Sequence, residues 1–349
     1  MPPDLQSQLE RFLAGRLPDA DGVCVLALER NMEGFSQECF SFDAEVRHGE
    51  RRELRSYVLK REPLTGLLEP YDLEPEFKVL HALSDQALLS PPTPWFSDDP
   101  ALLERPFYLM EKLSGEVPLP VEGPDGNGPF SECQRRALAP QVTKALAKLH
   151  AVGWREHGLG FLGAPEPGRA AAERELARWE ERIQRAGFPV APVLAESLAW
   201  LRANVPATDE ITLVHGDYRL GNFLVELEPD EAKLTGILDW EMVHLGDPLE
   251  DLAWCSSPLW RGGTPNVGTM VSPEEFADAY AAASKRAIDP ARMAFYETLS
   301  VVKMSAIMLT GIRAFQDGRT DELRMAVFDH QLPFLHALLA ASRGWLSGV

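Results

Sequence analysis

The first part of the chain, up to residue 113, is patterned mainly for short strands. Residues 3–17 are an exception, because apolar residues recur there at the spacing of one helix face. A charged hairpin tip is expected at 47–53, and a second helix is expected to begin at Glu74, since Pro75 suits a first helical turn. Apolar or alternating segments predict strands at residues 22–28, 39–46, 54–60, 95–96 and 107–113.

Helical patterns dominate the remainder of the chain. Ser131 and Gln134 are the ends of a capping-box sequence, which predicts a helix that continues to about His150. Further helices are predicted at residues 170–186, 192–203 and 320–342, and after the Ser-Pro and Asp-Pro starts at 272–273 and 289–290. We therefore expect an α+β protein with a β-rich lobe over residues 1–113 and a mainly helical lobe over residues 114–349.

The composition is that of a globular protein, with 45% apolar and 25% charged residues in 349 positions, a length that favours more than one core. The four cysteines show no C-x-x-C spacing and no secretory leader precedes them, so a reduced cytoplasmic setting is expected. No apolar run is expected to reach the length of a membrane span. The formal net charge of −19 argues against nucleic acid as a partner, because phosphate backbones require basic patches.

The most specific pattern is an apolar strand that ends at His215 and is followed by Asp217 and then Asn222. A second apolar strand ends at Asp239. The spacing H-x-D-x-x-x-x-N with a later strand-end aspartate is the one that kinases use for phosphoryl transfer. In that chemistry Asp217 would position the acceptor hydroxyl and take its proton. Asn222 and Asp239 would hold Mg²⁺ through oxygen atoms, the ligands that this cation prefers.

Turn chemistry offers another interpretation of the same residues, because Asp, Gly and Asn favour tight turns between strands. For Asp217, Asn222 and Asp239, the recurring spacing and the strands on both sides favour the functional interpretation. For His215 we adopt the structural interpretation. We expect this side chain to be packed in the core and to order the loop through hydrogen bonds.

The chain resembles the aminoglycoside phosphotransferase (phosphotransferase enzyme) family, which shares its fold with choline kinases, fructosamine kinases and eukaryotic protein kinases. It is especially similar to the kinase-like domain fused to some acyl-CoA dehydrogenases. The resemblance extends from about Val23 to the last helices and is strongest in segments 215–217, 237–241 and 246–253. It implies a protein-kinase-like α+β fold with two lobes, a small β-rich lobe that binds the nucleotide and a larger, mainly helical lobe that binds the acceptor.

The resemblance also implies a nucleotide site in the first lobe. A Gly-x-Ser turn that ends at Ser36 would offer backbone N–H groups and a hydroxyl to the phosphates. Lys60 lies where the third strand of the fold carries its nucleotide lysine, and Glu76 on the following helix would orient that lysine. The carbonyl of Glu111 and the amide of Leu113 would pair with the adenine edge.

Departures from protein kinases narrow the class of acceptor. Gly216 replaces the arginine that often docks a phosphorylated activation loop, and the segment between Glu241 and Asp247 is too short to be such a loop. A small-molecule acceptor is therefore expected rather than a protein. Asp247 and Asp251 are expected to stabilise the catalytic loop from a helix N-terminus rather than to bind metal.

The wall of the acceptor pocket is expected to combine residues near 150–205 with the helices after Ser272. Trp154 and Trp179 could stack on a substrate, although tryptophans at helical spacing more often belong to the core. The stretch 291–319 is largely apolar, with Lys303 and Arg313 as interior cations. That composition favours a small, partly apolar or anionic metabolite over a polycationic aminoglycoside, because ammonium groups need carboxylate partners when they lose water.

We therefore expect an Mg²⁺-assisted, ATP-dependent phosphotransferase that acts on a hydroxyl group of a small metabolite, with GTP as an alternative nucleotide. A nucleotide-binding pseudokinase or scaffold of the same fold is the alternative outside enzymes, although all the polar residues that the chemistry needs are present. An aminoglycoside-resistance kinase and a protein kinase have less support. The sequence leaves the identity of the acceptor and the oligomeric state open.

Overall fold

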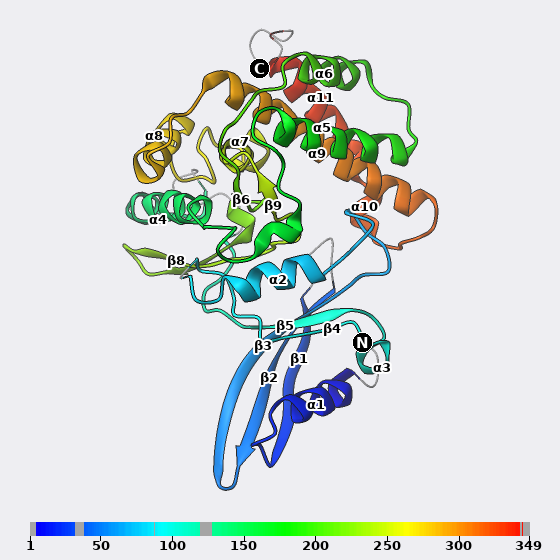
Figure 1. Ribbon diagram of the computed structural model, residues 1–349, viewed down its shortest axis with the longest axis vertical. Coiled ribbons are helices and arrows are strands. Elements are labelled where there is room, and N and C mark those ends of the chain that lie inside the picture. Colours follow the sequence, from blue (N-terminus) through cyan, green and yellow to red (C-terminus); the bar gives the residue numbers. More distant parts are fainter. Residues whose placement is uncertain (1–4, 32–37, 87, 119–127, 343, 345–349) are drawn as a thin grey trace. The chain divides into compact units, whose positions relative to one another are not determined.

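The computed structural model describes residues 5–31, 38–86, 88–118, 128–342 and 344. The chain divides into two compact units, Met1–Leu113 (unit 1) and Ser114–Val349 (unit 2). Unit 1 contains an antiparallel sheet, whereas unit 2 is mainly helical and carries short antiparallel strand pairs (Figure 1). The fold class is α+β, as the sequence predicted.

The described part of unit 1 forms an antiparallel sheet with the strand order β1-β2-β3-β5-β4. These strands are β1 (Gly22–Asn31), β2 (Glu38–His48), β3 (Arg51–Arg61), β4 (Trp95–Ser97) and β5 (Phe107–Glu111). Each strand predicted from the sequence is present. The hairpin tip predicted at 47–53 is present but shorter, because β2 and β3 continue through this charged segment and leave only Gly49 and Glu50 in the turn. Charged side chains are accepted there because the end of the ribbon is exposed to solvent.

Helices pack against this sheet within unit 1. Helix α1 (Leu5–Arg16) buries Leu5, Leu9, Phe12 and Leu13, which join a core that also contains side chains of β2, β3 and β5. The Phe12 and Phe107 rings meet edge to face, with centroids 5.0 Å apart. Helix α2 (Glu74–Ala82) starts with Pro75 in its first turn, as predicted, and α3 (Pro100–Leu103) is a single turn.

Unit 2 contains longer helices, and α5 and α9 lie side by side in it (Figure 1). The capping boxes predicted at Ser131 and Ser272 are both present and open α4 and α8. The helix predicted over 320–342 was wrong as one element, because α11 begins at Leu332 and Pro333 in its first turn lacks the N–H that a continuous helix would need. The helical elements of unit 2 are α4 (Glu132–His150), η1 (Leu159–Leu162), α5 (Ala170–Ala186), α6 (Pro192–Ala203), η2 (Leu220–Asn222), α7 (Leu249–Ser256), η3 (Pro258–Trp260), α8 (Pro273–Ser284), α9 (Pro290–Gln316), α10 (Leu323–Ala326), η4 (Phe328–His330) and α11 (Leu332–Ser342).

Short antiparallel pairs in unit 2 bring together the segments that carry the sequence motifs. Strand β6 (Thr212–Val214) pairs with β9 (His244–Gly246), and β7 (Phe223–Leu227) pairs with β8 (Ala232–Ile237). The loop between β6 and β7 therefore lies next to the turn between β8 and β9. This arrangement places the H-x-D-x-x-x-x-N segment beside the strand-end aspartate.

Helix α9 is long and apolar enough to cross a membrane by length and composition, so the expectation of no such run in the sequence was wrong. However, 67% of its apolar window is buried inside the protein, which is the environment of a core helix. Trp179 on α5 is fully buried, and Trp154 is buried with its indole N–H donating to the Ile211 carbonyl at 2.9 Å. Both tryptophans are therefore core residues rather than a stacking surface.

Candidate active site

In unit 1, the end of β3 carries a buried ion pair. Lys60 Nζ lies 2.7 Å from Glu76 Oε1, and the two residues are only 4% and 3% exposed. Glu76 reaches β3 because it belongs to the buried side of α2, together with Val79 and Leu80. The pairing that the sequence analysis expected is therefore present. Burying two charges is costly, so such a pair is best explained by a need for fixed geometry.

Three other residues were expected to contact the nucleotide, namely Ser36, Glu111 and Leu113. Ser36 lies outside the described residues. Glu111 ends β5 and its backbone N–H donates to the Pro92 carbonyl at 2.8 Å, and Leu113 is the last residue of unit 1. Their roles in binding a nucleotide stay predictions.

In unit 2, the loop after β6 holds the carboxylate of Asp217 in one orientation. Among the described residues, Trp254 Nε1 and Arg219 Nε donate to Asp217 Oδ1 at 2.7 and 2.9 Å, and Asn222 Nδ2 donates to Oδ2 at 2.7 Å. Asp217 is 7% exposed, so these charge-assisted hydrogen bonds are largely shielded from water. A carboxylate fixed in this way suits the positioning of a hydroxyl group.

Arg219 and Trp254 were not identified from the sequence. Arg219 stands inside the motif, two positions after Asp217, and its guanidinium lies over the Trp260 ring at 4.6 Å from the centroid. Its position next to the aspartate was an available signal. Trp254 is separated from Asp217 by 37 positions and lies on the buried helix α7, so no local pattern connects the two.

Asn222 and Asp239 are brought together by the β7–β8 hairpin. Phe223 pairs with Ile237, and beyond this pair the Leu238 N–H donates to the Asn222 carbonyl at 2.8 Å. The amide nitrogen of Asn222 is used by Asp217, which leaves its amide oxygen for a cation. Asp239 has a left-handed backbone with φ of +64°, a strained conformation that is typical of functional turns. The two oxygen donors fit a hard cation such as Mg²⁺.

His215 connects the loop after β6 to the turn after β8. Its Nδ1 accepts the Asp217 N–H at 3.1 Å, so the proton is on Nε2, which donates to the Leu238 carbonyl at 3.1 Å. Complete burial lowers the pKa of His215, although the carboxylates of Asp251, Asp217 and Asp239 oppose that shift. The ring is therefore neutral and joins the two turns through one tautomer. The expectation that His215 orders the loop is confirmed.

Asp251 on α7 anchors the same loop from behind. Its carboxylate accepts the N–H groups of His215 and Gly216 at 2.7 and 2.9 Å, and His150 Nε2 lies 3.1 Å from it. Burial opposes ionisation, but the His150 side chain and then the ring and backbone N–H of His215 outweigh it and lower the pKa of Asp251. Asp247 binds Arg292 and accepts the Leu249 N–H at 3.0 Å. Asp251 thus stabilises the catalytic loop as the sequence predicted, whereas the described contacts of Asp247 are with Arg292 and the first turn of α7.

Gly216 is required by its backbone and by its surroundings. Its φ is +82°, and a Cβ atom added there would lie 2.5 Å from the Met242 carbonyl oxygen. The glycine therefore lets the loop approach the β8–β9 turn closely.

Lys303 was expected to contribute a positive charge to the acceptor pocket, but its contacts are with the catalytic loop and α7. It is 3% exposed, its Nζ donates to the Gly216 carbonyl, and it lies 3.6 Å from Glu250 Oε1. Arg313 is also committed, since its Nε donates to the Ala186 carbonyl at 2.7 Å. Because Lys303 supports the catalytic loop and Arg313 binds a carbonyl, these two cations do not favour an anionic acceptor.

The chain matches the model of the phosphotransferase enzyme family over residues 40–296, and it belongs to that family. Acyl-CoA dehydrogenase family member 11 of Rattus norvegicus is 28% identical over 321 residues, which are 87% of this chain and 38% of the relative. This chain thus spans well under half the length of that relative.

Solved structures show the kinase-like fold of the aminoglycoside phosphotransferases. A candidate aminoglycoside phosphotransferase from Ralstonia eutropha superposes with a TM-score of 0.73 at 21% identity, covering 96% of this chain and 97% of that one. The GDP complex of aminoglycoside 2'-phosphotransferase-IIIa superposes with a TM-score of 0.60 at 17% identity, covering 95% and 98%.

Proposed function

We propose that this member of the phosphotransferase family transfers the γ-phosphoryl group of ATP to a hydroxyl group of a small metabolite. The observation that carries the proposal is the orientation of the Asp217 carboxylate by Trp254, Arg219 and Asn222, with Asp239 two residues beyond the end of β8, the strand that pairs with β7 directly after Asn222. A turn that served only to join two strands would not need a buried carboxylate with so many donors. ATP is proposed on the sequence motifs, and GTP is the alternative because a similar structure is a GDP complex.

The proposed reaction needs little covalent chemistry from the protein. The acceptor oxygen forms a bond to the γ-phosphorus, the bond from that phosphorus to the β–γ bridging oxygen breaks, and ADP leaves. Asp217 orients the hydroxyl and receives its proton, which then passes to solvent. Asn222 and Asp239 would hold Mg²⁺, which neutralises phosphate charge when bound. Lys60, fixed by Glu76, would hold the nucleotide phosphates.

The experiment is an ADP-release assay of the wild-type chain with ATP, Mg²⁺ and a pooled library of amino sugars, amino alcohols and hydroxy acids. The proposal expects acceptor-dependent ADP release and a new phosphomonoester signal in the ³¹P NMR spectrum. Nucleotide binding without release for any acceptor would instead favour the pseudokinase or scaffold.

A further inference from the structure

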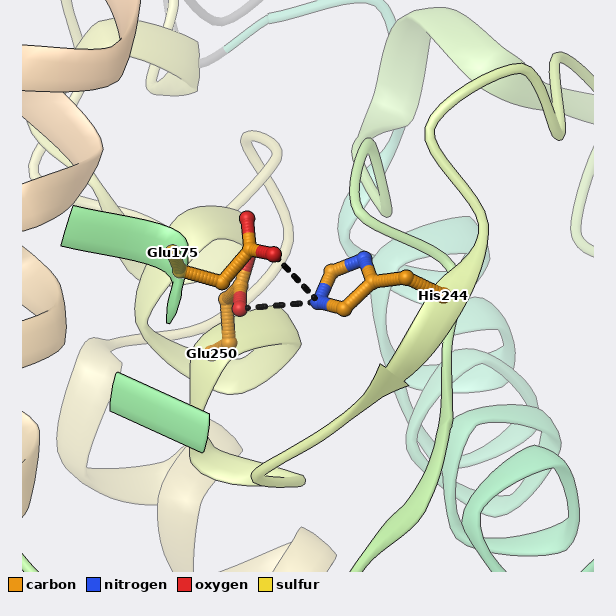
Figure 2. Close-up of side chains that lie close together, drawn as sticks. All are labelled: Glu175, His244 and Glu250. Atoms are coloured by element: carbon orange, nitrogen blue, oxygen red, sulfur yellow. Dashed lines mark hydrogen bonds and ion pairs between the residues drawn. The ribbon is translucent and has the colours of Figure 1, made fainter. Parts of the chain in front are cut away.

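Behind the catalytic loop, three titratable side chains from different elements of unit 2 meet (Figure 2). His244 of β9 places its Nε2 3.2 Å from Glu250 Oε2 of α7 and 3.7 Å from Glu175 Oε1 of α5. All three residues are buried. None of the three is among the expected catalytic residues. Burying charged groups costs free energy, so their presence here requires another explanation.

The ligand atoms of Glu175, His244 and Glu250 lie close enough together to hold a metal ion, but the charges around them do not favour one. Burial disfavours the charged form of His244, yet Glu175 and Glu250 outweigh it and raise the pKa of this imidazole. Burial likewise opposes ionisation of Glu175, but the charges of His244, Arg178 and Lys303 lower its pKa to about 2. The two carboxylates are therefore already balanced by protein cations. A divalent cation bound here would be repelled by these positively charged side chains.

Lys303 connects this group to the catalytic loop. Its Nζ lies 3.6 Å from Glu250 Oε1 and donates to the carbonyl of Gly216, which belongs to the peptide bond that precedes Asp217. On the other side, His244 Nδ1 donates to the Met242 carbonyl at 2.9 Å. This is the carbonyl against which Gly216 packs. The buried charges thus hold the Gly216–Asp217 peptide from two directions.

A second route leads from Lys303 to the carboxylate itself. Its Nζ lies 4.3 Å from the centroid of the Trp254 ring, a cation–π distance. The indole N–H of the same Trp254 donates to Asp217 Oδ1 at 2.7 Å. Lys303 therefore contacts both a backbone and a side-chain support of the expected catalytic residue.

We propose that Glu175, His244, Glu250 and Lys303 form a positioning network that fixes the Gly216–Asp217 peptide and thereby the orientation of the Asp217 carboxylate. The catalytic consequence rests on the proposed function, whereas the ordering of the loop does not. None of the four residues is assigned a contact with a substrate. Each acts through the loop.

The test compares Lys303→Met and Glu250→Gln with the wild-type chain. Loss of the network should lower kcat about 10- to 100-fold, because a small misplacement of a catalytic group has effects of that size. KM for ATP should change little. In hydrogen exchange, a peptide that covers residues 213–222 should exchange at least about tenfold faster in both variants. The exchange measurement needs no acceptor, so it tests the network even where the proposed function fails.

Leu335→Ala in α11 is the control, because Leu335 is a buried apolar side chain and takes no part in the ion pairs and hydrogen bonds that define the network. At an equal loss of melting temperature it should leave the exchange of residues 213–222 unchanged. The proposal is overturned where the network variants and this control show the same exchange of residues 213–222. One equivalent of zinc retained by the wild-type chain and absent from Glu250→Gln would also overturn it.

Discussion

The side-chain amide of Asn222 donates to both the backbone carbonyl and a carboxylate oxygen of Asp217, at 2.8 and 2.7 Å. One residue thus fixes the backbone and the side chain of the expected catalytic group. Since the amide nitrogen is committed, only the amide oxygen of Asn222 can serve a cation. The two expected functions of this loop, orienting the acceptor and holding Mg²⁺, are therefore coupled through one side chain.

This coupling predicts the behaviour of Asn222→Ala. We expect kcat to fall about 10²-fold or more, because the Asp217 carboxylate loses an orienting donor. The Mg²⁺ concentration that gives half-maximal activity should rise in the same variant, because an oxygen ligand is lost. A magnesium titration of ADP release measures both effects. A lower kcat at an unchanged magnesium requirement would show that Asn222 orients Asp217 without binding the cation.

The Lys60–Glu76 pair predicts separate effects on stability and on nucleotide binding. Lys60→Met leaves Glu76 buried without its cation, which should lower the free energy of unfolding by about 3–5 kcal/mol. ATP with Mg²⁺ should raise the melting temperature of the wild-type chain by mass action and raise that of the variant less, each relative to its own ligand-free value. Thermal and urea unfolding supply both quantities.

The same helix offers a matched control. Lys78 lies 2.9 Å from Glu74 on the exposed face of α2, so Lys78→Met should cost no more than about 0.5 kcal/mol and leave the nucleotide shift unchanged. Equal nucleotide shifts for the Lys60 and Lys78 variants would remove Lys60 from the nucleotide site.

Gly216→Ala tests the close approach of the loop to the Met242 carbonyl. Both the positive φ and the 2.5 Å contact oppose a side chain, so the loss in unfolding free energy should exceed about 2 kcal/mol. Gly163 has a φ of +72° with nothing within 4 Å of an added Cβ, so Gly163→Ala should cost only about 1 kcal/mol. Urea unfolding compares the two variants. Equal losses would mean that the loop can move away from Met242.

The depressed pKa of Glu175 predicts a pH dependence of stability. A carboxylate whose pKa is lowered from 4.5 to about 2 stabilises the fold above pH 4.5, and this contribution is lost as the pH falls from 4.5 towards 2. In Glu175→Gln that contribution is absent at every pH. The difference in unfolding free energy between wild type and variant should therefore be constant just above pH 4.5 and shrink below it. A constant difference throughout this range would contradict the ionised state.

The site residues that could be predicted from the sequence belong either to short-range patterns or to an arrangement known from the family. Asp217 and Asn222 share one loop, and the proline at the start of α2 indicated the helix that carries Glu76. Lys303 was assigned to the wrong environment, because its partner Gly216 is 87 positions away and a buried lysine looks the same in sequence whether it faces a pocket or a loop. The support by His244 and Glu250 was not found for the same reason.

The boundaries of elements show a related limit. The whole charged segment 47–53 was predicted as the hairpin tip because its residues are polar, yet only Gly49 and Glu50 form the turn, since a strand pair that is exposed to water needs no apolar face. In the last part of the chain, the apolar pattern of 320–342 is continuous, although Pro333 prevents one continuous helix. Local propensity therefore indicated the kind of structure in these segments better than where it changes.

The central claim, that Asp217 is the catalytic residue of a small-molecule phosphotransferase, is tested most directly by Asp217→Asn. The measurement is ADP release from ATP and Mg²⁺ with the pooled acceptor library, alongside the thermal shift that ATP produces. We predict that the variant keeps the thermal shift and releases ADP about 10²–10⁴-fold more slowly than the wild-type chain. Equal acceptor-dependent release by the wild-type chain and Asp217→Asn would contradict the claim.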